Sequence, residues 1–193
     1  LKGLGGFQLL CDARNPKAVA SLRQRKNRPA KPFAIMVKDE VQAEELCHIS
    51  KNEMTLLISP EKPIVILDSK MNPMVTNQVA PGNPTLGVML PYTPLHHLLM
   101  QGLGFPIVAT SGNLANEPIC IDEQEAVERL AGIADGFLIH DRPIVRPVDD
   151  SVVRWMADSR MILRRARGFA PFPIHQKNGE NSILATGAHL KNT

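Results

Sequence analysis

Hydrophobic and polar residues follow two different periods along this chain, and the sequence therefore predicts both strands and helices. Short apolar runs bounded by proline, glycine or aspartate are typical of buried strands, whereas apolar positions three and four residues apart indicate helices. Prolines stand at most of the expected element ends, where they act as breaks. The predicted strands are 33–37, 63–67, 86–90, 106–110, 136–139, 151–156 and 161–164.

Four helices are expected, one before the first of these strands and three between them, because each begins with a capping residue followed by apolar residues at helical spacing. Two of the starts also carry a proline at the first helical position. The second helix is expected to run to Ile49, and Gly102 is expected to end the third. The predicted starts are Asn15-Pro16, Asp39 with Gln42, Thr93-Pro94, and Asp122 with Glu125.

Strands and helices alternate over most of the chain, but the last three expected strands follow one another with short connections. A purely parallel, doubly wound sheet requires a crossover between successive strands, so that fold is excluded. The sequence predicts an α/β (α+β) fold in which helices flank a mixed, twisted sheet. Residues 68–83 are polar and contain proline, glycine and asparagine, and they are expected to form an exposed loop.

The composition is that of a globular protein: 193 residues, 44% of them hydrophobic, suit one domain or two small ones. No segment approaches the roughly 20 apolar residues of a membrane span, and no signal peptide is recognisable. Cys11, Cys47 and Cys120 are far apart and form no CxxC pair. We therefore expect buried thiols, no zinc site and a cytoplasmic location. Because the sequence lacks an initiator Met, we expect a piece of a longer chain.

Positive charge is concentrated in two blocks, although the formal net charge is only +3. Eight Lys and Arg residues lie between Ala13 and Lys38, and five lie between Ser159 and Gly179, with no acidic residue in either block. A single basic run is most often a solvated surface. Two runs indicate an anionic partner, such as a phosphate, a nucleotide or a nucleic acid, if the fold brings them together.

Three polar motifs could carry chemistry, and each also has a structural explanation. Lys26-Asn27-Arg28 can bind a polyphosphate, or it can simply complement the dipole of the helix that ends there. Thr110-Ser111-Gly112-Asn113 offers several donors at a strand end, but these are also ordinary turn residues. Asp149-Asp150 could hold Mg²⁺, although an ion pair with Arg146 or Arg154 is the favoured interpretation.

Two further features are weaker signals. His96 and His97 are neighbours on a predicted helix and point about 100° apart, so they do not form a metal-binding pair. One of them is expected near a site and the other at the surface, and no metal ligand is assigned. Gly3, Gly5 and Gly6 match neither a phosphate-binding loop nor a dinucleotide fingerprint, and we expect a tight segment that approaches a ligand.

The order of these motifs resembles the YrdC-type domain. Lys26-Asn27-Arg28 is similar to its KxR motif and Ser111-Gly112-Asn113 to its SxN motif. Asp150-Ser151-Val152-Val153 and Ile162-Leu163-Arg164 are similar to two of its late strands. The resemblance covers about residues 2–172 and implies a YrdC-like fold that binds ATP and forms carbamoyl-adenylate compounds.

Other segments resemble the branch of this family found in hydrogenase maturation carbamoyltransferases of the HypF type; they are 2–7, 28–34, 90–97, 164–168 and, like the start of a carbamoyl-transfer domain, 186–193. The implied domains are 1–172, a YrdC-like nucleotide-binding domain, and 173–193, a linker and the start of the carbamoyl-transfer domain. The resemblance also implies further domains of the same chain before this piece, including a zinc-finger region.

The resemblance implies a reaction as well. Carbamate, released from carbamoyl phosphate, would be activated by ATP with Mg²⁺ to carbamoyl-adenylate, and pyrophosphate would leave. The carbamoyl group would then pass to the C-terminal cysteine of a HypE-type acceptor, on the route to the cyanide ligand of nickel–iron hydrogenases. Attack of one anion on another requires cations, and labile intermediates require a closed cleft.

The resemblance and the charges together predict the site residues. Lys26 and Arg28 are the expected catalytic pair. The residues expected to bind phosphate and nucleotide are Lys31, Thr110, Ser111, Asn113, Ser151 and Arg164, and those beside the carbamoyl group are Lys2 and Tyr92.

Three other functions stay open at this point. The first is synthesis of threonylcarbamoyl-adenylate for tRNA modification, which another branch of the family performs. The second is an RNA-binding module, although an aromatic content of 4% leaves few platforms for base stacking. The third is a docking domain without catalysis.

Overall fold

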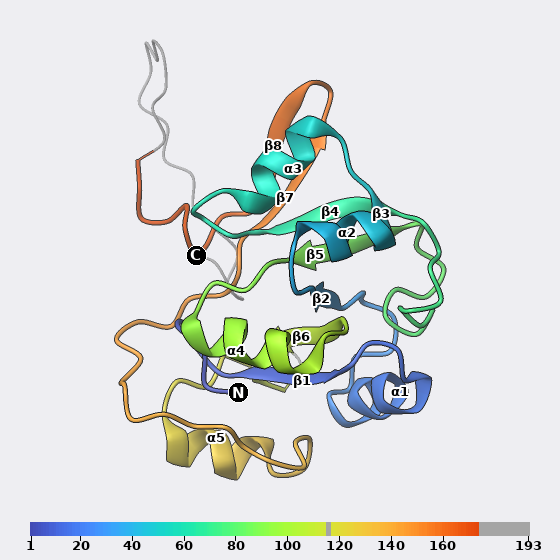
Figure 1. Ribbon diagram of the computed structural model, residues 1–193. Coiled ribbons are helices and arrows are strands. Elements are labelled where there is room, and N and C mark those ends of the chain that lie inside the picture. The colour runs from blue at the N-terminus through green and yellow to red at the C-terminus, as the bar shows by residue number, and fades with distance from the viewer. Residues whose placement is uncertain (115–116, 174–193) are drawn as a thin grey trace.

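The computed structural model describes residues 1–114 and 117–173, which form one sheet and five helices (Figure 1). The strand order is β1-β6-β2-β5-β4-β7-β8, and β3 pairs with β4 outside this path. The pairs β2–β5 and β4–β7 are parallel and the other pairs are antiparallel. The mixed sheet predicted from the sequence is confirmed. The strands are β1 (Gln8–Asp12), β2 (Ala34–Met36), β3 (Cys47–His48), β4 (Ile64–Ser69), β5 (Thr85–Met89), β6 (Ile107–Ser111), β7 (Val152–Met156) and β8 (Ser159–Arg164).

The helices begin where capping side chains bind N–H groups of the first turn. Asn15 accepts hydrogen bonds from the N–H groups of Lys17 and Ala18, and Ser50 and Glu53 form a complete capping box. All four starts predicted from the sequence are confirmed. The helices are α1 (Pro16–Arg25), α2 (Glu40–Leu46), α3 (Lys51–Ile58), α4 (Pro94–Leu103) and α5 (Glu123–Leu130).

Two helix ends differ from the prediction. The helix expected to reach Ile49 ends at Leu46, because Cys47 adopts an extended conformation and pairs with β4. The separate helix α3 that follows was not predicted. α4 continues past Gly102 to Leu103 and is capped by Gly104, whose φ of 70° is a left-handed conformation that glycine adopts easily.

Three further segments differ as well. Residues 136–139 are not a strand, although the N–H of Lys2 donates to the carbonyl oxygen of Leu138 at 2.9 Å. Strand β1 was not predicted. Within the loop expected to be exposed, Val79 and Ala80 are buried.

The two faces of the sheet are covered differently, since each strand directs alternate side chains to opposite faces. On one face Ile35, Val65, Val88 and Val108 pack with residues of α1, α2, α3 and α5 in the larger apolar core. On the other face α4 packs through Met100 on a smaller apolar cluster. The helix α4 covers only part of this second face, and the remainder is open to ligands.

Cys47 and Cys120 are buried and Cys11 is partly buried, all as free thiols. Burial raises the pKa of Cys47 to about 12, so this thiol stays protonated and packs as a small apolar group. In the described residues, no helix has both the length and the apolar character needed to cross a membrane. Residues 174–193, predicted to belong to a linker and a further domain, lie outside the described residues.

Candidate functional site

A cavity of about 240 Å³ lies on the open part of the second sheet face. Its floor is a row of small residues, because Ala34 of β2 is in register with Gly87 of β5 and with Ala109 of β6. A Cβ atom at Gly87 would lie only 2.9 Å from Cγ2 of Ile64. The absence of larger side chains across three neighbouring strands leaves a flat apolar surface.

Three cationic side chains line this cavity, and they come from both basic blocks. Arg28 and Lys31 belong to the first block and Arg164 to the second. Burial, together with the charges of Arg23 and Arg164, lowers the pKa of Arg28 to about 10. An anion bound here would relieve this repulsion. We call Arg28, Lys31 and Arg164 the cationic cluster.

Arg23 holds the segment that carries two of these cations. Its buried guanidinium donates to the carbonyl oxygens of Arg28 and Lys31, each at 3.0 Å. It also donates to the carbonyl oxygens of Gln78 and Val79, at 2.6 and 2.9 Å. Backbone contacts on two sides therefore fix the place where the first basic block meets the cavity.

A β-bulge directs Arg164 into the cavity. Val152 pairs with Arg164 but Val153 pairs with Ile162, so Leu163 is an extra residue in β8. Val153 and Ile162 pack in the larger core, whereas Val152 and Arg164 line the cavity. Without the bulge, the two-residue period of a strand would place Arg164 on the packed face with Ile162.

Lys26, expected to bind phosphate, instead binds the loop 111–113. Its buried Nζ donates to the carbonyl oxygens of Ser111 and Asn113 at 2.6 and 2.5 Å, and to Oδ1 of Asn113 at 2.8 Å. Asn27 has a φ of 51°, which turns the chain so that the next residue, Arg28, faces the cavity. In this arrangement Lys26 positions the loop at the end of β6.

The predicted polar residues of that loop divide between the cavity and its support. Thr110 and Ser111 line the cavity, and Oγ1 of Thr110 accepts a hydrogen bond from Arg28 at 3.3 Å. Asn113 is buried behind them, and its Oδ1 accepts a hydrogen bond from the Ser111 hydroxyl at 2.6 Å. The SxN motif thus supplies one cavity group, Ser111, beside Thr110, and Asn113 is the brace behind them.

Two other predicted residues lie outside this cavity lining. Ser151 is buried, and its hydroxyl exchanges hydrogen bonds of 2.8 Å with the backbone of residues 166–167. Lys2 is buried, forms an ion pair with Glu123 and donates to the carbonyl oxygen of His140 at 3.0 Å. The structure therefore does not bring Ser151 or Lys2 to the cationic cluster.

A second polar group lines the cavity around the side-chain amide of Gln8. Nε2 of Gln8 donates to Oη of Tyr92 at 2.9 Å and to Oδ2 of Asp150 at 3.2 Å, while Oε1 lies 3.0 Å from Nε2 of His96. Arg167 lies over the Tyr92 ring, with its guanidinium carbon 3.5 Å from the ring centroid. We call Gln8, Tyr92 and Asp150, which all line the cavity, the amide-centred cluster.

Burial keeps the rings of this group uncharged. Desolvation raises the pKa of the Tyr92 phenol and lowers the pKa of His96 to about 4. His96 is fully buried and its neighbour His97 is exposed, which confirms that the two point in different directions. Tyr92 was predicted to be a substrate residue, and it is the one of that predicted pair that lines the cationic cavity.

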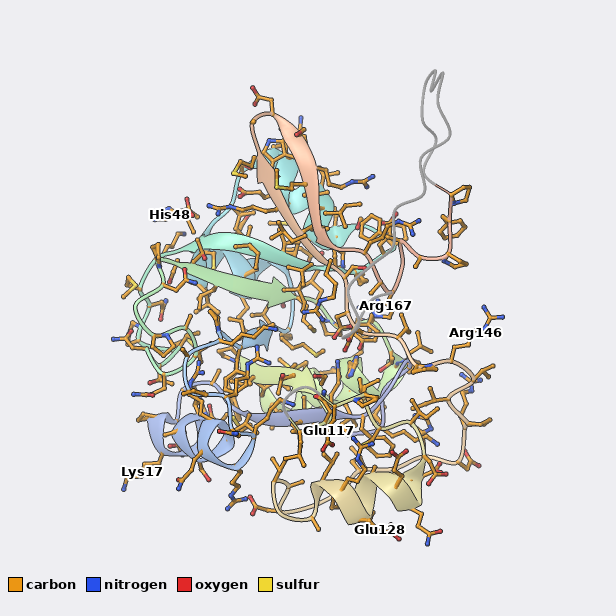
Figure 2. All side chains as sticks on the ribbon, turned by 180° about the vertical axis from the view of Figure 1, so that it is seen from behind. Lys17, His48, Glu117, Glu128, Arg146 and Arg167 are labelled. Atoms are coloured by element: carbon orange, nitrogen blue, oxygen red, sulfur yellow. The ribbon has the colours of Figure 1, made fainter. Side chains whose placement is uncertain are left out.

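The two adjacent aspartates pair with arginines, but not with the predicted ones. An Arg167 nitrogen lies 2.9 Å from Asp150, and an Arg164 nitrogen lies 3.9 Å from Asp149. Figure 2 shows Arg167 within the fold and Arg146 projecting outward from a peripheral loop. The prediction was wrong because the β7–β8 pairing brings the second basic block back beside the aspartates. The arginines predicted as partners were Arg146 and Arg154.

Sequence reasoning missed Gln8 and Arg167 as parts of the site. Arg167 belongs to the second basic block, so its charge was visible although its position was not. Gln8 carries no motif of its own, and its only signal is that it follows the glycine-rich start. Gly5 and Gly6 of that start do line the cavity, as expected.

A cationic cavity over a flat apolar floor is typical of a domain that binds a nucleotide or another phosphate compound. The profile of the Sua5/YciO/YrdC family, described as "Telomere recombination", matches residues 1–166, and the chain belongs to this family. The resemblance drawn from the motifs is thereby confirmed.

Individual proteins with high sequence identity to this chain include carbamoyltransferases named HypF. The chain is 55% identical over 194 residues to the carbamoyltransferase HypF of Synechocystis sp., covering 100% of this chain and 25% of the relative. It is 47% identical to the HypF of Rhodobacter capsulatus, covering 99% and 26%. The chain thus spans about a quarter of the length of these relatives. A threonylcarbamoyl-AMP synthase of Bacillus subtilis is 28% identical over 67% of this chain.

The fold also matches a solved structure, the crystal structure of full-length HypF in the phosphate- and nucleotide-bound form. The TM-score is 0.87 at 50% sequence identity, over 90% of this chain and 27% of that one. The YrdC-like fold predicted from the sequence is therefore confirmed.

Proposed function

We propose that this cavity binds ATP and activates carbamate as carbamoyl-adenylate. The observation that carries the proposal is the convergence of Arg28 and Arg164, from separate basic blocks, on one cavity with a flat apolar floor. The nucleotide named for the 50%-identical HypF structure supports the same class of ligand.

The floor suits the adenine ring. Ala109, Ala34 and Gly87 lie on three adjacent strands, which are about 4.8 Å apart, so the row spans roughly the width of a purine. Phosphates extending from this floor would meet the cationic cluster. Arg28 and Arg164 supply planar sets of donors that suit phosphate oxygens, and Lys31 supplies a mobile point charge.

In the proposed step, a carboxylate oxygen of carbamate attacks the α-phosphorus of ATP. The new P–O bond replaces the bond to the bridging oxygen, and pyrophosphate leaves with that electron pair. Arg28 and Arg164 reduce the repulsion between the two anions and stabilise the charge on the departing group. Thr110 donates from the end of β6, beside Ser111, whose own hydroxyl proton is bound by Asn113, and Lys26 and Asn113 hold that loop in place.

Mg²⁺ is proposed to accompany ATP, bound mainly through the phosphates, which commonly provide its ligands together with water and one or two carboxylates. Asp150 is engaged by Arg167, and Arg164 lies 3.9 Å from Asp149. We therefore assign no protein ligand to the ion. Ser151 and Lys2 keep a supporting role in the proposal, through the 166–167 backbone and Glu123 respectively.

The wider reaction is proposed from the relatives named HypF, of which this chain covers about a quarter. Carbamoyl phosphate would supply the carbamate, and a HypE-type protein would accept the carbamoyl group in the cytoplasm. Other domains of the same full-length chain would perform the first and last steps.

Pyrophosphate–ATP exchange tests the proposal. Ammonium bicarbonate, as a source of carbamate, is expected to support exchange, and threonine with bicarbonate is not. Exchange with threonine alone would assign the chain to threonylcarbamoyl-adenylate synthesis, the second candidate. Absence of ATP binding in calorimetry would overturn the nucleotide assignment. RNA binding is the third candidate, and retention on RNA that does not saturate or respond to salt would dismiss it.

A further inference from the structure

The amide-centred cluster has a fixed arrangement of hydrogen-bond donors and acceptors. An ionised carboxylate only accepts, so the Gln8 group 3.2 Å from Asp150 is its NH₂, and its oxygen faces His96. His96 therefore carries its proton on Nε2 and donates it to Gln8. The orientation of the Gln8 amide and the position of the His96 ring proton both follow from the negative charge on Asp150.

Tyr92 and Asp150 share a hydrogen bond at the cavity, where a ligand can replace it. Oη of Tyr92 accepts from Gln8, and the phenol proton is directed to the Asp150 carboxylate, with which Tyr92 has a side-chain hydrogen bond. Oδ1 of Asp150 accepts two N–H groups of Arg167, at 3.1 and 2.9 Å, and Oδ2 accepts from Gln8. A ligand carbonyl that takes over the phenol proton frees a lone pair of this carboxylate for an N–H donor of the same ligand. Because both residues line the cavity, a ligand meets one O–H donor and one carboxylate acceptor.

We propose that Asp150 accepts an N–H of the carbamoyl group and that Tyr92 donates to its carbonyl oxygen, so that Asp150 determines specificity for the acyl group. This inference rests on the proposed function. A carbamoyl group presents an N–H donor beside a C=O acceptor, which is the complement of this pair. An acetyl group has the carbonyl but no N–H.

The charge of Asp150 also orients the substrate. The Asp150 carboxylate repels the oxygens of free carbamate and attracts its amino group. The amino end then lies against Asp150, and the nucleophilic oxygens are left to face the cationic cluster. Gln8 and Arg167 act as positioning residues, because they hold the two oxygens of Asp150.

The test compares two stable sulfamoyl analogues of acyl-adenylates, carbamoyl and acetyl, which differ only in NH₂ against CH₃. Calorimetry on the wild-type protein is expected to give about ten-fold or greater preference for the carbamoyl analogue, as for one hydrogen bond to a charged group. In Asp150→Asn the amide oxygen turns to Arg167 and its NH₂ to the ligand, so the preference is expected to fall to about one.

Tyr92→Phe is the matched control, since it keeps the ring beneath Arg167. Both analogues should weaken by a similar factor, and their ratio should persist. A wild-type ratio near one, with both analogues bound, overturns this inference and leaves the adenylate site standing. A ratio that persists in a folded Asp150→Asn also overturns it. Failure of both analogues to bind the wild-type protein overturns the proposed function and this inference together.

Discussion

The cationic cluster and the amide-centred cluster line the same cavity but are built in different ways. Arg28 is held mainly by backbone carbonyl groups of its own segment, and the acid nearest Arg164 lies 3.9 Å away. In the amide-centred cluster, Gln8 joins Tyr92, Asp150 and His96 through hydrogen bonds of 2.9 to 3.2 Å. One cluster attracts by charge, which acts at a distance and tolerates small shifts. The amide-centred cluster recognises a ligand by the geometry of its hydrogen bonds, and these do not tolerate small shifts.

The largest expected effect concerns the support beneath the cationic side. Lys26→Met would leave three buried oxygen atoms without their ammonium partner, and is expected to lower the free energy of unfolding by about 3–5 kcal/mol. Urea unfolding measures this change. Lys17→Met is the matched control on the exposed side of α1 (Figure 2) and should change stability by less than about 0.5 kcal/mol. Equal losses of unfolding free energy in the two variants would contradict the structural role of Lys26.

The next effect concerns the support of the amide-centred side, and it depends on pH. The pKa of His96 falls from 6.5 in the unfolded chain to about 4 in the fold, so only the unfolded chain binds this proton between those values. Stability is therefore lost as pH falls from 6.5 to 4, by about 3 kcal/mol from this group.

His96→Gln should remove that part of the pH dependence, because glutamine keeps an N–H donor for Gln8 and does not titrate. Urea unfolding of both proteins at pH 7 and pH 4 measures the difference. His97→Gln, which changes the exposed neighbour, should keep the wild-type pH dependence. If His96→Gln loses as much stability on acidification as the wild type, the buried neutral imidazole is refuted.

A smaller effect separates charge recognition from fold support. Arg28→Ala should lower ATP affinity by about ten- to a hundred-fold, through loss of charge-assisted hydrogen bonds worth roughly 1.5–3 kcal/mol. Arg25→Ala is the control, since Arg25 is exposed and pairs with Asp135 away from this cavity. Calorimetry should show the loss in the first variant only. Unchanged ATP binding by a folded Arg28→Ala would sink the assignment of the cationic cluster to phosphate.

The smallest effect tests the floor that both clusters share. In Gly87→Ala the new Cβ would protrude where the adenine ring is placed, and ATP affinity should fall a few-fold, by roughly 1 kcal/mol or less. Gly102→Ala is the control, because its Cβ would meet open space on α4. There the affinity should stay constant and the helix should gain up to about 1 kcal/mol. Tighter ATP binding in Gly87→Ala would place the base elsewhere.

The sequence predicted most elements because their signals are local. The helix caps are local, because the side chains of Asn15, Thr93 and Asp122 bind N–H groups two or three residues further along the chain. Strands β4, β5 and β6 are each marked by an apolar run in their own sequence. The C-terminal end of α2 was predicted wrongly because Cys47 pairs with β4, a strand further along the sequence. Pairing with β4 outweighed a helical pattern that would otherwise have continued to Ile49.

The site was predictable in its charges but not in the directions of its side chains. Lys26 and Arg28 are two cations of one short motif, and the sequence does not distinguish their roles. The left-handed turn at Asn27 directs Arg28 to the cavity and leaves Lys26 to support the loop 111–113. Gln8 acts through a single amide whose partners come from two distant segments, so no local pattern marks it. The sequence revealed two basic blocks, and only the strand order showed where they meet.

The extra residue at Leu163 also bears on how far the length of β8 can vary. Leu163 is about half exposed, so many side chains should be accepted there. Removing the residue altogether would restore an uninterrupted strand in which Arg164 directly follows Ile162 and still pairs with Val152, so its guanidinium would keep facing the cavity. Hairpins of two lengths, one with the bulge and one shorter by this residue, should therefore present the arginine to the cavity equally, a freedom in strand length that identity at the position itself does not reveal.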